Sequence, residues 1–196
     1  MKRILLIVAL GLGILTANAQ IEKLAGPRLG FTFISPGPIA DFLHDGFDFD
    51  EEDDGQYGST GPAFTTLYGW QWESRFADGG GQIVGIVEWI VLVGGMEKGM
   101  FLPSASSIIG ARMDNGLEFG VGPNLSLSGI GMVFGVGYNF KSGNLNLPIN
   151  ISVIPGRALE GTIHHYDNDY DNHWEEKYEY NTGTRIAITL GFNMSK

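Results

Sequence analysis

Residues 116–128, GLEFGVGPNLSLS, alternate without interruption between apolar residues and small or polar ones. Side chains along a β-strand point to opposite faces with a period of two, so this segment has one apolar face and one polar face. Leu117 and Phe119 belong to the first face, and Glu118 and Gly120 belong to the second. Similar alternation recurs along the chain. The pattern predicts an all-β protein whose strands separate an apolar environment from a polar one.

Eight segments are predicted to be strands, because each alternates or is rich in β-branched and aromatic residues. They are residues 24–35, 63–76, 81–93, 104–113, 116–126, 130–140, 145–154 and 183–194. Their lengths of ten to fourteen residues exceed the usual strand of about five to six residues and suit the roughly 9 to 11 residues of a tilted membrane strand. The predicted fold is an eight-stranded antiparallel up-and-down transmembrane β-barrel.

The connections between these segments alternate in length. Residues 78–80, 114–116 and 141–144 contain the Gly and Asn-Gly signals of tight hairpin turns, whereas residues 36–62 and 155–182 are long connections. Outer-membrane barrels keep short turns on the periplasmic side and longer loops outside. The long connections are therefore predicted to be external. The first of them is also expected to contain one short helix that begins at a proline, a residue favoured in a first helical turn.

Residues 1–19 have the features of a secretory signal peptide. Two basic residues precede an apolar run over residues 4–15, and residues 17–19, Ala-Asn-Ala, supply a cleavage site. The run is shorter than the roughly 20 residues that a spanning helix needs. We therefore expect export and cleavage, with residues 20–196 forming the barrel.

The charge of the mature chain argues against one class of partner. Loss of two basic residues with the signal peptide leaves 10 Lys and Arg (12 minus 2) against 22 Asp and Glu, a net charge of −12. Nucleic acid is not expected to bind such a chain. The sequence has no Cys, so disulfides and thiol chemistry are excluded.

The two faces of the predicted strands differ in chemistry. Large apolar side chains such as Phe31, Trp70, Trp89 and Ile151 fall on the outward face, which is predicted to contact lipid. Charged side chains fall on the inward face, where the side chains of an eight-stranded barrel fill the interior and must pair. The predicted lumen charge network consists of Arg28, Glu73, Arg75, Glu88, Arg112, Glu118 and Arg185. Four cations nearly balance three anions, which predicts a filled polar lumen.

The chain resembles the small eight-stranded outer-membrane barrels of the OmpA and OmpX type, found in bacteria with two membranes. The resemblance rests on the alternation over nearly the whole mature chain, on the closing segment 185–194, RIAITLGFNM, and on residues 134–140, FGVGYNF. It implies an integral outer-membrane protein in contact with lipid and lipopolysaccharide. The pattern is not specific for any activity, and we expect a monomer.

Two of the predicted external loops are acidic. Residues 41–54 hold eight carboxylates and no Lys or Arg, and residues 164–176 combine Asp with His, Tyr and Trp. Acidic runs are ordinarily solvated surface, and the sharper hypothesis is a divalent cation, because hard oxygen ligands suit Ca²⁺ or Mg²⁺. The candidate ligands are Asp48, Asp50, Glu52, Asp167, Asp169 and Asp171. No other cofactor is expected.

The sequence favours a non-enzymatic barrel with a structural or surface-recognition role. Aromatic and polar side chains in residues 164–176 suit contact with an external protein or glycan. One alternative is a lipid A-modifying outer-membrane enzyme, for which His165 beside Asp167 is the best available pair, although no Gly-x-Ser-x-Gly motif occurs. A second alternative is a secreted soluble ligand-binding barrel, which would turn its apolar face inward.

Overall fold

The computed structural model describes residues 23–46, 60–78, 82–167 and 172–195, with the backbone alone for 78, 163–167, 172–174 and 195. The predicted signal peptide lies outside the described residues. So do five of the candidate metal ligands: Asp48, Asp50, Glu52, Asp169 and Asp171.

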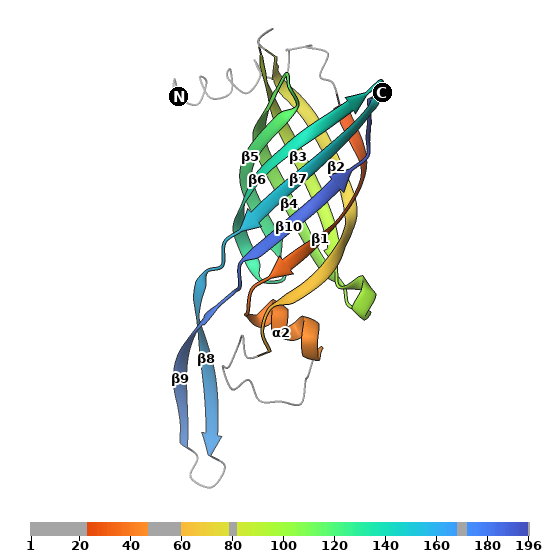
Figure 1. The fold of residues 1–196 in the computed structure, drawn as a ribbon. Coiled ribbons are helices and arrows are strands. Elements are labelled where there is room, and N and C mark those ends of the chain that lie inside the picture. Colours follow the sequence, from red (N-terminus) through yellow and green to blue (C-terminus); the bar gives the residue numbers. More distant parts are fainter. Residues whose placement is uncertain (1–22, 47–59, 79–81, 168–171, 196) are drawn as a thin grey trace, which may run out of the picture.

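The described residues form a closed antiparallel β-barrel (Figure 1). Its strands are β1 (Lys23–Ile34), β2 (Ala63–Asp78), β3 (Ile83–Gly94), β4 (Leu102–Met113), β5 (Leu117–Ser126), β6 (Gly129–Ser142), β7 (Leu145–Ile154) and a last strand divided into β10 (Arg185–Gly191) and β11 (Asn193–Ser195). Each strand pairs with the next, and β1 closes the barrel by pairing with both β2 and β10. Counting β10 and β11 as one strand, the predicted eight-stranded antiparallel barrel is confirmed.

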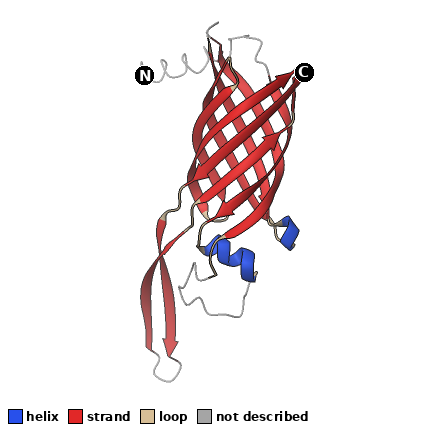
Figure 2. Cartoon of the chain, viewed as in Figure 1, coloured by secondary structure: helices blue, strands red, loops and turns tan. Residues whose placement is uncertain are grey.

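The two ends of the barrel differ, as Figure 2 shows. One end of the barrel, called the turn end, has the turns that join β4 to β5 and β6 to β7, together with the end of β11. The opposite end, called the loop end, has the helix α2 (Pro38–Asp45), the short 3-10 helix η1 (Met96–Lys98) and the β8–β9 hairpin. This asymmetry agrees with the predicted alternation of connection lengths.

The β8–β9 hairpin is the largest departure from the prediction. Residues 155–182 are predicted to be a long loop, but β8 (Ala158–Asp167) and β9 (Asn172–Asn181) pair over ten residues each and project beyond the barrel. Among the described strands they pair only with each other. In β9, aromatic residues at positions 174, 178 and 180 alternate with charged ones, but Glu176 interrupts them and only Leu159 and Ile163 mark the same face of β8, so the alternation was not recognised.

The two faces of the barrel differ as the alternation predicts. Large apolar side chains are exposed on the outside, including Phe31 at 42%, Trp89 at 58% and Ile130 at 64%. Polar and charged side chains alternate with them and are buried inside, as Glu73 at 1% and Gln71 at 0% show. A period of two therefore assigns both faces of most strands correctly.

The helix α2 covers part of the loop end, and its prediction is confirmed. It begins with Pro38 in the first turn, and its Ala40 and Leu43 pack against Ile34 of β1 and Ala63 of β2. Its carboxyl end is held by Lys98, whose Nζ donates to the carbonyl oxygen of Leu43 at 2.8 Å. The helix is thus fixed by both apolar and polar contacts.

A surface carboxylate at the loop end gives a pH-dependent contact. Glu97 accepts hydrogen bonds from the amide of Thr66 at 3.1 Å and from its hydroxyl at 2.5 Å. Partial burial alone would raise the pKa of Glu97, but hydrogen bonds from Thr65 and Thr66 outweigh it and lower the pKa to about 2. Because folding lowers this pKa, the contact stabilises the loop above the ordinary pKa of 4.5 and is lost as the pH falls towards 2.

We expect the side-chain carboxyl carbon of Glu97 to titrate in the folded protein with a midpoint near pH 2. In a Thr66→Val variant, which removes the hydroxyl donor at nearly constant shape, the midpoint should rise towards 4.5. Carbon-13 NMR of selectively labelled Glu measures both values. An unchanged midpoint in the variant would show that the hydroxyl does not stabilise the carboxylate.

Candidate functional site

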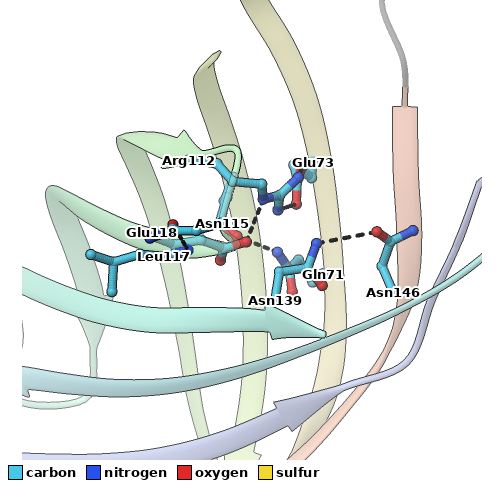
Figure 3. A network of polar contacts seen from close by, with 9 residues as sticks. Gln71, Glu73, Arg112, Asn115, Leu117, Glu118, Asn139 and Asn146 are labelled. Atoms are coloured by element: carbon cyan, nitrogen blue, oxygen red, sulfur yellow. Dashed lines mark hydrogen bonds and ion pairs between the residues drawn. The ribbon is translucent and has the colours of Figure 1, made fainter. Parts of the chain in front are cut away.

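Arg112 lies at the centre of a buried ionic cluster in the turn-side half of the lumen (Figure 3). Its Nη1 and Nη2 donate to the two carboxylate oxygens of Glu73 at 2.6 and 2.7 Å, and its Nε donates to Glu118. Arg112 stands opposite Glu118 in the β4–β5 register, and Glu73 comes from β2, which β3 separates from β4. All three side chains are at most 7% exposed. The guanidinium therefore links strands that are not neighbours.

A second part of the cluster surrounds Glu88. This carboxylate stands directly opposite Glu73 in the β2–β3 register and accepts a hydrogen bond from the amide of Gln71. Arg28 of β1 is buried, and its charge acts on Glu73, Glu88 and Glu118. Three acids and two guanidinium groups thus share one interior, and the two cations keep the neighbouring carboxylates from repelling one another.

The structure brings five of the seven residues of the predicted network into one cluster, places Arg75 in a pocket beside it and separates Arg185 from it. Arg75 lies towards the turn end, where it lines a polar pocket of about 460 Å³ with Arg112 and Lys141. Arg185 lies at the loop end, where its Nη1 donates to the Ser126 hydroxyl at 2.8 Å. Both arginine side chains point inward, as the alternation along their strands predicts. Alternation gives the face of a strand on which a residue lies, but not its position along the barrel axis.

Buried amides extend the cluster beyond the predicted residues. The Asn139 amide donates to the Asn146 side-chain oxygen at 3.1 Å, and Gln71 and Asn193 are fully buried. These residues share the inward parity of the charged ones. A prediction that took every polar residue on the inward face would therefore have included these amides, whereas a prediction based on charged residues alone leaves them out.

The loop-side half of the lumen combines aliphatic and polar side chains and is hollow, which corrects the prediction that the lumen is filled. It contains a cavity of about 120 Å³. Aliphatic side chains from seven strands and α2 line it: Ile34, Ile39, Leu67, Ile86, Ile90, Leu92, Ile108, Val133, Ile154 and Ala187. In β3 the inward positions near the loop end, Ile90 and Leu92, are aliphatic as well as the outward ones, so alternation there does not reveal where the charged interior ends.

The other predicted groups are only partly described. Side-chain positions for His164, His165, Asp167 and His173 lie outside the described residues. His44 of α2 is exposed, and its Nε2 lies 3.1 Å from the carbonyl oxygen of Pro62. Within the described part of the chain, no three His, Cys, Asp or Glu side chains are grouped to hold a metal ion. The cation hypothesis for the acidic loops stays a prediction.

Comparison with known proteins leaves the barrel to be interpreted from its own residues. No protein-family model and no curated protein sequence matches the chain. Among solved structures, an acetoacetate decarboxylase-like enzyme from Sphingomonas wittichii RW1 aligns over 88% of this chain and 92% of its own, with 8% identity and a TM-score of 0.12. A score this low carries no argument about fold or activity. In the described residues, no helix is long and apolar enough to cross a membrane.

Proposed function

We propose that this protein is an integral, non-enzymatic barrel of the outer membrane of a two-membrane bacterium. The observation that carries the proposal is the belt of large apolar side chains exposed around a barrel that buries its charges. This belt includes Phe31, Trp70, Trp89, Phe134, Val136 and Ile151. Soluble monomers rarely expose contiguous apolar patches larger than a few hundred Å², whereas a barrel in lipid requires an apolar band. The soluble alternative would need the opposite arrangement.

The difference between the two ends supports one orientation in the membrane. Outer-membrane barrels have short periplasmic turns and longer external loops. By this rule the turn end faces the periplasm, and α2, η1 and the β8–β9 hairpin face outward. Lipopolysaccharide then surrounds the loop end of the barrel.

The β8–β9 hairpin supports a role in surface recognition. It presents the backbone edges of two strands and a pair of aromatic rings, Tyr178 and Tyr180, whose centroids are 5.8 Å apart. Strand edges and amphipathic aromatic side chains are both used to bind protein or glycan partners. The rigid barrel would serve to hold this hairpin at the cell surface.

Cysteine labelling tests both the location and the orientation, because the natural chain has no Cys. Glu179→Cys places a thiol on the hairpin, and Asn144→Cys places one in the β6–β7 turn at the opposite end. A membrane-impermeant maleimide should label position 179 in intact cells, and position 144 only after the outer membrane is permeabilised. Equal labelling of both sites in intact cells, or recovery of the protein in the soluble periplasmic fraction, would contradict the proposal.

A further inference from the structure

The cavity in the loop-side half of the barrel has a wide aliphatic wall, and its polar lining includes Glu88 and Glu118 beside the ionic cluster and Arg185 towards the loop end. Its volume of about 120 Å³ is roughly eight to twelve times the 10–15 Å³ that one buried water requires, so the space is larger than an ordinary packing defect. Ile86, Ile90, Ile108 and Val133 present buried aliphatic surface to it. Protein interiors are normally close-packed, so a guest that fills this space with apolar atoms would gain contacts.

The wall formed by β6 keeps the space open. Gly135 points inward and lines the cavity, and a Cβ added there would meet no heavy atom closer than 3.9 Å. Its neighbours on the same strand, Val133 and Gly137, also face the lumen. A larger side chain at position 135 would therefore extend into the cavity rather than clash with the backbone.

Arg185 gives the same cavity a cationic rim at the loop end, and the exposed Arg157 lies outside the cavity lining, near Gly129. Arg185 lines the cavity and donates to Ser126 at 2.8 Å and to Asn124 at 3.4 Å. The Arg157 guanidinium lies 3.4 Å from the position that a Cβ on Gly129 would take, and Gly129 is the register partner of Ser126. Within the described residues, neither arginine forms an ion pair with a carboxylate.

We propose that this cavity binds the alkyl chain of a small anionic amphiphile, with the chain against Ile90 and Ile108 and the anionic end at Arg185. The ligand class is a fatty-acid carboxylate or an alkyl phosphate. An alkyl chain matches the aliphatic wall, and either anion supplies the charge that the rim lacks. The proposal goes beyond the outer-membrane role, because the cavity lies inside the barrel wherever the barrel resides.

Titration with octanoate, followed by methyl NMR of isoleucine-labelled protein in lipid nanodiscs, tests the proposal. Ile86, Ile90 and Ile108 face the cavity, whereas Ile130 and Ile151 face outward and report on octanoate dissolved in the lipid. Saturable shifts confined to the inward methyl groups are expected. Octyl phosphate, titrated separately, distinguishes the two anions by affinity, and octyltrimethylammonium serves as the cationic control.

Two variants that fill the cavity and one that removes the rim charge complete the test. Gly135→Leu should abolish the saturable shifts, and Ala187→Leu provides the same test from β10 if the first variant does not fold. Arg185→Gln should weaken octanoate binding about tenfold, the usual effect of losing a hydrogen bond to a charged group. Val121→Leu, on the outward face and outside the cavity lining, is the unaffected control. Inward methyl groups that do not move, that respond equally to the cation, or that still saturate in both filled variants would overturn the proposal.

Discussion

Replacing Arg112 with methionine is expected to lower the free energy of unfolding by about 3–5 kcal/mol, the usual cost of removing one partner from a buried ion pair. The substitution leaves Glu73 and Glu118 buried without the guanidinium that donates to both. The measurement is urea-induced unfolding of the protein in lipid vesicles, followed by the gel shift between folded and heat-denatured forms.

Lys141→Met is the control for this experiment, because Lys141 is an exposed cation at the end of β6 and exposed charges contribute little to stability. A triple variant that combines Arg112→Met with Glu73→Gln and Glu118→Gln should recover much of the loss, because it removes the unpaired charges. If Arg112→Met unfolds at the same urea concentration as the natural protein, the cluster does not stabilise the barrel.

Val136→Arg should destabilise the barrel by about 2–4 kcal/mol in a bilayer, the usual cost of an arginine side chain that faces lipid at the bilayer midplane. Val136 is exposed on the outward face, near the middle of β6. The natural and variant proteins are compared by equilibrium unfolding in vesicles.

Ile130→Arg is a matched control, since Ile130 lies on the same strand and the same face but close to the loop end. Near the membrane interface the same substitution should cost only about 0–1 kcal/mol. Equal effects at both positions would contradict the proposed membrane belt, because a soluble surface has no such depth dependence.

Strand number, strand order and the faces of the barrel could be predicted from the sequence because all three follow from local patterns. Gly in the turns marks the hairpins. Alternation along each strand places Glu73, Arg112 and Glu118 on the inward face, even where the exact ends of the strands are not known. The predicted segment 145–154 even coincides with β7.

The features that escaped prediction depend on position in three dimensions. Parity does not show that Arg185 lies far along the barrel axis from Glu73, because that separation is set by the stagger between strands. The apolar cavity escaped for the same reason, since Ile86, Ile90 and Ile108 gather only once the barrel closes. The β8–β9 hairpin escaped because Glu176 and His165 interrupt the apolar positions on one face of an otherwise polar segment.

The hairpin also determines how the protein would carry a mechanical load. β8 continues from β7 and β9 leads into β10, so a pull on the hairpin by a bound partner acts on two adjacent barrel strands at once. Hydrogen bonds in an antiparallel sheet lie perpendicular to the strands, so a force along the strands shears the β6–β7 and β1–β10 pairs together instead of unzipping them singly. In the proposed membrane setting, this arrangement would make the barrel resist extraction by tension.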